Sequence, residues 1–381
     1  MDLVLGSLAA NGGPTNTHAL GATSVALEAA TDCTLIDGTT PVDFDQRGVV
    51  RPQDGDGGGG PLCDVGSFES RPFGVDIHLV DGVTCTLGDA IEAANWDVTV
   101  GGCVDSGVGA DQIYLEADVV LSAADESRSS FVRGAWAGLP DVTSKISISS
   151  GKNGASAIGR DSALDCDAAD GPGEFRLFQV VGNGDLTLNG LTLTNGCANM
   201  GGAVLVVDSA TLTVDSATFT ANTARSATDA RGGAICSLSS AQITISGSTF
   251  QQNGSYGNEA LGGAVLAESP FDLLGSRFLA NEAIAMVGEG AGGAVYHDRE
   301  TTMTWSDLVF RDNVARGGSS DGTGRSANGG AVYLRSVFST SSLTRASFVG
   351  NEAHGGAGVE GGDANGGALH LAYGTPLASL D

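Results

Sequence analysis

Apolar and polar residues alternate along short segments in the second half of the chain. In ATLTV (210–214), Leu212 and Val214 share one face while threonine occupies the other, and AQITI (241–245) repeats the pattern. A period of two built from Val, Ile, Leu and Thr is typical of β-strands and not of helices. These segments recur along the chain, which predicts a repeat architecture.

Two motifs mark the repeat. Gly-Gly-Ala followed by an aliphatic residue begins at residues 201, 232, 262, 292, 329 and 366. Phe-x-x-Asn follows each of the first five, at Phe219/Asn222, Phe250/Asn253, Phe278/Asn281, Phe310/Asn313 and Phe348/Asn351. The offset from the first Gly to the Phe varies only from 16 to 19, while the offset from the Asn to the next Gly varies from 9 to 16. One part of each repeat is therefore nearly constant in length, and the other part contains nearly all the insertions.

Each repeat of about thirty residues contains three short strand-like runs. One follows Gly-Gly-Ala, one is the alternating segment, and a very short one ends in Phe. This pattern predicts one coil of a parallel β-solenoid, in which stacked coils bury a continuous core. We expect the Gly pair at a tight bend, the Phe in an internal ladder, and the Asn in a left-handed turn with amides bonded between layers.

The alternation of these two motifs resembles the repeats of chlamydial polymorphic outer-membrane proteins and related bacterial surface β-helix proteins. The resemblance covers residues 174–381. It implies an all-β fold, a right-handed parallel β-helix, and a secreted or cell-surface role that is often adhesive.

One helix is predicted, in CTLGDAIEAANWDVTVGGC (85–103). Leu87, Ile91 and Ala94 have helical spacing, and Thr86 with Asp89 forms a capping-box-like start. The segment resembles the CSLREA segment that precedes β-helices in secreted bacterial proteins, although it departs from that motif at its Ser, Arg and Glu positions. Such a helix can cover the open end of a solenoid.

Residues 1–70 contain DQRGVVRPQ and CDVGSFE, which resemble the closing choice-of-anchor Q segment of the same β-helix proteins. The predicted domains are therefore this terminal segment (1–70), a cap with a first strand (71–115), and the repeat region (116–381). A closing segment placed before a cap has two explanations. Either the chain is a window on a tandem array, or one molecule closes the end of another to form a filament.

The chain is strongly acidic, with 18 Lys and Arg against 45 Asp and Glu and a formal net charge of −27. Such a charge repels nucleic acid and anionic lipid, so neither is an expected partner. No run of residues is long and apolar enough to insert in a membrane. The start of the chain does not read as a leader, so the chain is either cytosolic or an excerpt of a longer secreted protein.

Seven cysteines are present, and none forms a Cys-x-x-Cys pair. Cys33 and Cys63 flank one polar region, and Cys85 and Cys103 flank the predicted helix. These pairs read as disulfides, which favours an oxidising compartment, against the alternative of reduced structural thiols.

Candidate chemistry is sparse. Asp161, Asp165, Asp167 and Asp170 approach the spacing of a calcium loop but miss its pattern, and DGDGGGG (54–60) reads as a flexible loop. No nucleophile motif occurs. We therefore predict no catalytic residue, no metal ligand and no cofactor.

Two surface features are candidates for binding. The fifth residue of each Gly-Gly-Ala strand should face outward, either as a partly apolar stripe or as an ordinary surface ladder that the insertion loops partly cover. This row comprises Leu205, Cys236, Leu266, Tyr296, Tyr333 and His370. His297 lies in a different register from His370. The variable stretches between Asn and Gly-Gly all leave one corner, and their glycine content indicates adaptable or poorly ordered loops.

These features favour a non-enzymatic extracellular or cell-surface β-helix, adhesin-like or a structural stalk. Its expected partners are surface glycans or proteins of a host or neighbouring cell. The alternatives are a carbohydrate-binding or polysaccharide-degrading enzyme, and a filament subunit that associates head to tail.

Overall fold

The computed structural model describes residues 3–9, 16–21, 24–30, 32–35, 38–42, 45–46, 51–52, 62–70, 75–80, 82–103, 109–151, 156–167, 173–299, 301, 303–335, 341–372 and 379–380. The chain divides into two compact units. Unit 1 comprises residues 1–116 and 145–147, and unit 2 comprises residues 117–144 and 148–381.

Unit 1 contains the helix described in this structure. Its elements are β1 (Leu5–Ala9), β2 (Thr17–Leu20), β3 (Val75–Val80), α1 (Leu87–Trp96) and β4 (Ala110–Leu115). Strands β1 and β2 are antiparallel, whereas β3 and β4 are parallel. The predicted helix start is confirmed, because the side chain of Thr86 accepts a hydrogen bond from the backbone N–H of Asp89 at 3.1 Å.

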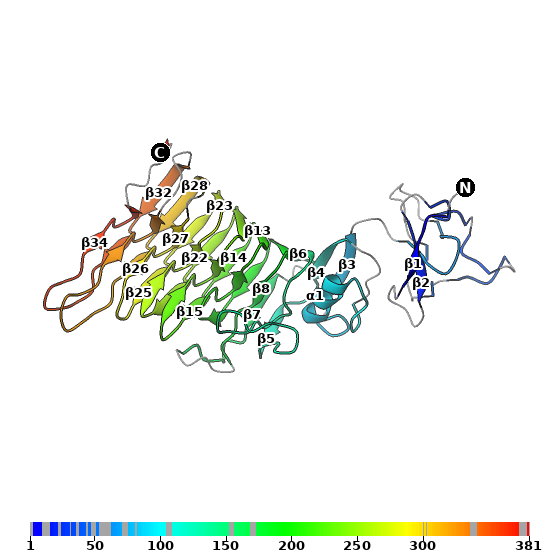
Figure 1. The fold of residues 1–381 in the computed structure, drawn as a ribbon, viewed down its shortest axis with the longest axis horizontal. Helices are drawn as coiled ribbons and strands as arrows, with labels where there is room; N and C mark the ends of the chain where they lie inside the picture. Colours follow the sequence, from blue (N-terminus) through cyan, green and yellow to red (C-terminus); the bar gives the residue numbers. More distant parts are fainter. Residues whose placement is uncertain are drawn as a thin grey trace. The chain divides into compact units, whose positions relative to one another are not determined.

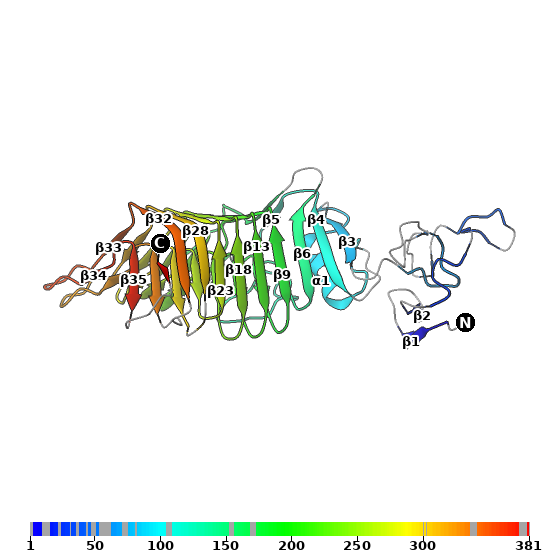
Figure 2. The same ribbon diagram turned by 90° about the horizontal axis from the view of Figure 1, so that it is seen from above.

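Unit 2 is built from parallel strands, and each repeat adds one strand to each of several sheets (Figure 1). The alternating segments form one row of a long sheet: β9 (Asp185–Asn189), β13 (Thr211–Asp215), β18 (Gln242–Ser246), β23 (Phe271–Leu274), β28 (Thr304–Arg311), β32 (Ser342–Val349) and β36 (Ser379–Leu380). Figure 2 shows the strands from β9 to β32 side by side. Strand β6 (Lys145–Ser150) contains residues of both units.

The strands that carry Phe219, Phe250 and Phe278, together with three earlier strands that carry no Phe, form a second row of the long sheet. This row contains β5 (Val119–Leu121), β7 (Ala157–Arg160), β10 (Thr192–Thr194), β14 (Thr218–Thr220), β19 (Thr249–Gln251) and β24 (Arg277–Leu279). Strand β28 pairs with both β23 and β24, so it joins the two rows.

The six runs after Gly-Gly-Ala and one strand that precedes them in the chain form a seven-stranded sheet, here called the GGA sheet. Its strands are β8 (Phe178–Val180), β12 (Val204–Val206), β17 (Ile235–Ser237), β22 (Val265–Ala267), β27 (Val295–Asp298), β31 (Val332–Arg335) and β35 (Leu369–Ala372). Within the described residues, strands are thus stacked repeat upon repeat in parallel register.

The Gly-Gly corner is explained by backbone geometry. The first glycine of each pair has a left-handed backbone, as at Gly201 with a φ of 59°. In the first five pairs the second glycine has no room for a side chain, as at Gly202, where a Cβ atom would lie 2.5 Å from the carbonyl oxygen of Gly233 in the next layer. Both positions therefore require glycine.

The Phe ladder is confirmed. The rings of Phe219, Phe250, Phe278, Phe310 and Phe348 stack along unit 2 with centroid separations of 4.7–5.0 Å. The first four are fully buried. Since each ring faces the same kind of neighbour above and below, the core repeats with the layers.

The Asn ladder is also confirmed, but the predicted backbone of the Asn is wrong. The left-handed residue is the one before it, such as Ala221 with a φ of 54°. The Asn itself is a buried link between layers. The amide of Asn281 donates to the carbonyl oxygens of Phe250 and of the Asn313 side chain, each at 3.0 Å, and its own oxygen accepts from Asn253.

Asn281→Ala should destabilise unit 2 by about 2–4 kcal/mol, because it leaves several buried hydrogen-bonding groups without partners. The measurement is urea unfolding, with Thr249→Ala, a half-buried change on the outer face, expected to stay within about 0.5 kcal/mol of the parent. Equal stabilities for the two variants would contradict the proposed role of the ladder.

Both predicted disulfides are present, and a third was not predicted. Cys33 pairs with Cys63, Cys85 with Cys103, and Cys166 with Cys197. Cys236 is the free thiol, fully buried in the GGA sheet, and burial raises its pKa to about 12.

Alkylation should therefore label no cysteine in the native chain, one after unfolding without a reductant, and all seven after unfolding with a reductant. Mass spectrometry of the peptides checks these counts. More than one label in the unfolded, unreduced chain would show that a pair is reduced.

Candidate binding surface

The variable stretches between Asn and Gly-Gly are ordered strands, so the prediction of poorly ordered loops is wrong. Each stretch contributes one strand to each of two parallel sheets, which together are called the arm. The first arm sheet contains β11 (Cys197–Ala198), β15 (Thr223–Arg225), β20 (Gly254–Gly257), β25 (Glu282–Ala285), β29 (Val314–Arg316) and β33 (Glu352–His354). The second contains β16 (Asp229–Arg231), β21 (Glu259–Leu261), β26 (Gly290–Ala291), β30 (Ala327–Asn328) and β34 (Ala364–Asn365).

Small residues explain how the two arm sheets pack. Ala260 of one sheet forms a buried cluster with Ala283 and Ala285 of the other. A Cβ atom on Gly290 would lie 2.1 Å from the carbonyl oxygen of Arg316. The glycine content of these stretches therefore reflects close approach of backbones and not conformational freedom.

The second arm sheet carries a row of carboxylates. Asp229 and Glu259 are register partners in adjacent layers, and Glu289 follows in the next, where its carbonyl oxygen accepts from the N–H of Ala260. Partial burial, and then the charges of Asp229 and Glu289, raise the pKa of Glu259. Arg231 lies beside this row.

Arg231 links the arm to the GGA sheet. Its guanidinium lies 3.5 Å from the carboxylate of Asp229 and 2.9 Å from that of Glu268. Glu268 directly follows β22, so this cation joins carboxylates of two sheets.

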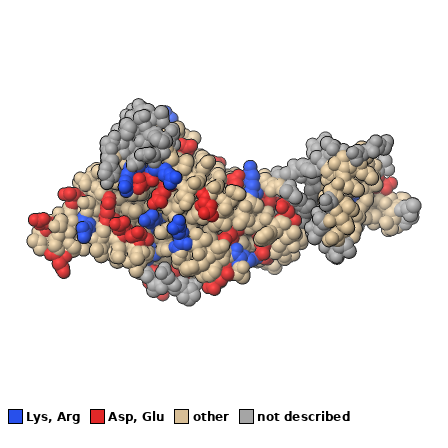
Figure 3. Space-filling view, viewed as in Figure 1, with Lys and Arg blue, Asp and Glu red and all other residues tan. Residues whose placement is uncertain are grey.

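The first arm sheet presents a mixed polar face. The guanidinium of Arg225 lies 4.8 Å from the ring centroid of Tyr256, whose hydroxyl donates to the Glu282 carboxylate. Burial and this hydrogen bond raise the pKa of Tyr256. Acidic groups are interspersed with a few basic ones on the face drawn in Figure 3.

Five of the six residues in the fifth-residue row of the GGA strands are buried. The predicted exposed stripe is therefore wrong, and the alternative of a row partly covered by the insertion stretches is confirmed. Leu205, Cys236, Leu266, Tyr296 and Tyr333 belong to one apolar cluster on the face of the sheet opposite the Val204 row. The cluster also holds two residues that end arm strands, Leu261 and Ala291. The arm therefore helps to cover this row.

The two candidate histidines occupy different environments, as their registers predict. His370 is half-buried and stacks on Tyr333 with a centroid distance of 5.3 Å. His297 is fully buried, and its Nδ1–H donates to the Ala267 carbonyl oxygen at 3.0 Å. Burial lowers the pKa of His297 to about 4, so the ring is neutral at pH 7. A buried neutral ring with these contacts is a structural residue.

Because folding lowers the pKa of His297 from about 6.5 to about 4, its neutral form supports the fold above about pH 6.5, and that support is lost as the pH falls to about 4. His297→Gln should reduce this pH dependence by about 3 kcal/mol in urea unfolding followed by tryptophan fluorescence. His354→Gln, at an exposed position, is the control. Parallel stability curves for H297Q and the parent would refute the assignment.

The described aspartates of the aspartate-rich loop belong to no cluster of three or more ligand-type side chains. The carboxylate of Asp161 accepts from the N–H of Ala163, two residues on, at 2.9 Å. Asp165 offers its backbone oxygen to Arg160, and Asp170 lies outside the described residues, as does DGDGGGG (54–60). Among the described residues, one group of side chains could supply three metal ligands: Cys166, Glu174 and Cys197. The two cysteines of this group form a disulfide with each other.

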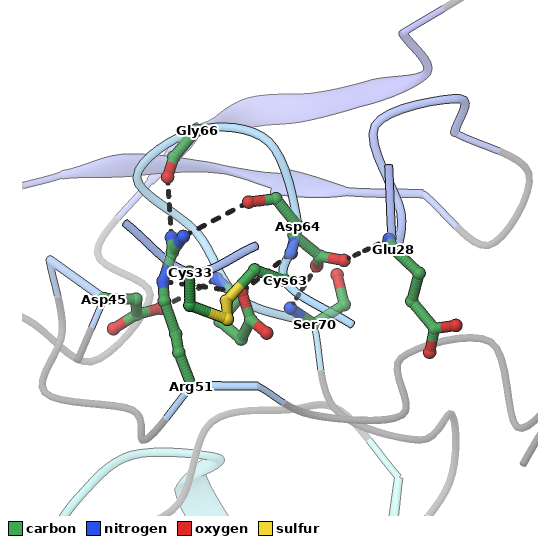
Figure 4. A network of polar contacts seen from close by, with 9 residues as sticks. Glu28, Cys33, Asp45, Arg51, Cys63, Asp64, Gly66 and Ser70 are labelled. Carbon is green, nitrogen blue, oxygen red and sulfur yellow. Dashed lines mark hydrogen bonds and ion pairs between the residues drawn. A yellow bond between two sulfur atoms is a disulfide. The ribbon is translucent and has the colours of Figure 1, made fainter. Parts of the chain in front are cut away.

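In residues 1–70 the polar residues of the two quoted motifs converge (Figure 4). The guanidinium of Arg51 lies 3.4 Å from the Glu69 carboxylate and donates to the carbonyl oxygens of Asp64 and Gly66. Asp64 and Glu69 are buried, and each carboxylate accepts backbone N–H groups. Asp45 likewise accepts from the N–H of Glu69 at 2.9 Å.

This network fastens distant segments of unit 1. The sequence shows that these two motifs carry charged residues, but their spacing does not indicate that Arg51 and Asp45 contact Asp64 and Glu69. Since these carboxylates are engaged by backbone groups and one Arg, their arrangement serves the fold.

Comparison of the chain with models of protein families, with curated protein sequences and with solved structures finds no match. No helix among the described residues is long and apolar enough to cross a membrane.

Proposed function

We propose that this chain is a non-enzymatic extracellular or cell-surface protein whose unit 2 is a right-handed parallel β-helix. Its role is adhesive or that of a structural stalk. The observation that carries this proposal is the arm, a set of ordered strands that repeats in register along one side of the GGA sheet.

The stacked parallel pairing supports the β-helix. Each turn of the repeat returns to pair with the same strand one layer on, and the Phe and Asn ladders follow the same period. Connections between parallel strands of one sheet are right-handed in about 98% of proteins, which favours that hand here. The resemblances to polymorphic outer-membrane repeats, to the CSLREA cap and to the choice-of-anchor Q segment agree with this architecture.

The three disulfides support the location. Disulfides form and persist in oxidising compartments, and each pair here closes within one chain. They indicate an extracellular type of environment. The excess of acidic residues keeps such a surface soluble.

The arm supports a binding or scaffolding role. In solenoids, insertions that vary between repeats are carried on one face, which is often the face that binds. Here the variable stretches form a polar face with Arg225, Tyr256 and Glu282 in neighbouring layers. A preformed face of this kind suits a protein or glycan partner on another cell.

One observation favours the alternative of a polysaccharide-degrading enzyme. Asp229 and Glu259 lie in adjacent layers, where strands are spaced by about 4.8 Å, and Arg231 lies beside them. Two carboxylates at a separation of about 5 Å are the arrangement that retaining glycosidases use. The same row also suits a scaffold with a charged flank.

Surface display tests the proposal directly. Antibody against the purified chain should label intact, unpermeabilised cells of the source organism, or detect the chain in their medium. Labelling that appears only after permeabilisation would refute it.

The purified chain should release no reducing ends from a panel of polysaccharides. Release that Glu259→Gln abolishes, while the exposed arm substitution Asp321→Asn does not, would establish the enzyme instead. A molar mass that grows with concentration in light scattering would favour the filament.

A further inference from the structure

A cleft of about 440 Å³ opens at one end of the GGA sheet, within unit 2. It is lined by residues of one covering segment and of three successive turns: Ser130, Val132, Arg133, Val181, Gly182, Val207, Asp208 and Ser239. Gly182, Asp208 and Ser239 occupy equivalent positions after β8, β12 and β17, and each has a left-handed backbone. The cleft therefore belongs to the repeat and to the segment that covers its edge.

The covering segment is held by a buried polar network. Arg176 is fully buried and donates to the carbonyl oxygens of Val132 and Ala135, at 3.1 and 3.0 Å. It also donates to the side chain of Gln179 at 2.6 Å. Because the Arg176 guanidinium donates to backbone oxygens of the covering segment, it holds the cleft wall from Val132 to Ala135 against the chain that leads into β8.

A second set of bonds fixes Ser130. The amide of Gln179 donates to the Ser130 carbonyl oxygen at 3.1 Å and to the Asp141 carboxylate at 2.8 Å. That carboxylate accepts in turn from the backbone N–H of Ser130 at 3.1 Å. The wall is thus preorganised by residues that do not line the cleft, which lowers the entropy lost when a ligand binds.

The floor and the rim differ in chemistry. Val132, Val181 and Val207 form an apolar floor that continues the buried cluster of the GGA sheet. Arg133 on one wall and Asp208 on the other bring a donor and an acceptor to the rim. Asp208 is oriented by the N–H of Gly182, which donates to its carboxylate at 3.1 Å, and the Arg133 carbonyl oxygen accepts from the Asn199 amide at 2.5 Å.

We infer that this cleft binds one sugar residue of a neutral glycan. The valine floor suits the C–H face of a pyranose ring, the Asp208 carboxylate accepts from ring hydroxyls, and the Arg133 guanidinium and the Ser239 hydroxyl donate to ring oxygens. Small-ligand sites typically combine an apolar lining with a few polar groups, and this open cleft has both.

The charge of the chain selects a neutral ligand. With a formal net charge of −27, the surface opposes the approach of uronates, sialates and phosphates, whereas a neutral polyol meets no such field. This inference rests on the proposed adhesive function and names the class of ligand for it, a neutral glycan. Binding at the cleft can be measured on the isolated chain, independently of where the protein is displayed.

Titration of the full chain with methyl glycosides of glucose, galactose and mannose, followed by ligand-detected NMR, tests the site. At least one neutral glycoside should bind, and Asp208→Asn and Arg133→Gln should each weaken binding by about tenfold or more. Asp208→Asn keeps an acceptor for Gly182, so its fold should be intact by thermal unfolding. Asp215→Asn, which removes the same charge from β13 of the same repeat, is the matched control and should bind as the parent does.

Three outcomes would overturn the inference: no binding of any neutral glycoside up to on the order of 10 mM, binding that D208N and R133Q leave unchanged, or stronger binding of methyl glucuronide or of free leucine than of every neutral glycoside. A chain that is displayed on the cell surface but shows one of these outcomes would lose this site and keep the proposed function. A chain that binds glycosides but is found only inside cells would keep the site and lose that function.

Discussion

The register between layers is the constraint on which the rest of unit 2 depends. Every buried Asn amide bonds to the layer before it and the layer after it, so each layer satisfies polar groups that its neighbours cannot satisfy alone. A slip of one residue would leave those groups unpaired in the core, which is costly. The stacked Phe rings and the glycine corners follow the same spacing because the amide ladder leaves no freedom for another.

Alternation and repeat spacing were sufficient for the strands and the core. Leu212 and Val214 lie on the buried face, and the Phe rings stack as their motif predicts. The left-handed backbone conformation was predicted for the Asn and belongs to the residue before it. The motif shows that an amide is needed, but it does not show which residue adopts the turn conformation. Ala221 makes the turn because Asn222 must keep its side chain between the layers.

The strands of the arm were beyond the reach of these patterns, whereas covering of the fifth-residue row by the insertion stretches was one of the two alternatives that the repeat spacing left open. Strands of two or three residues rich in Gly and Ala carry no alternation to detect, and their stability comes from close backbone packing. Alternation alone predicts that Tyr296 points outward from the GGA sheet. In the structure it is buried, in a cluster that also contains Leu261 and Ala291 of the arm. The cleft was equally out of reach, because Arg133 and Asp208 are distant in sequence and line one cleft only where the covering segment lies against the repeat.

The Asn ladder also has a direction, and this bears on how such a chain changes length. Each amide donates to the Phe carbonyl oxygen of the preceding layer, and each side-chain oxygen accepts from the Asn of the preceding layer, so every interior layer makes the same set of bonds as the next interior layer. A whole repeat can therefore be duplicated or lost by recombination with no new type of contact at the junction. Most of the length variation between repeats lies in the arm, so a lineage of such proteins would vary in steps of one coil while its arms diverge residue by residue.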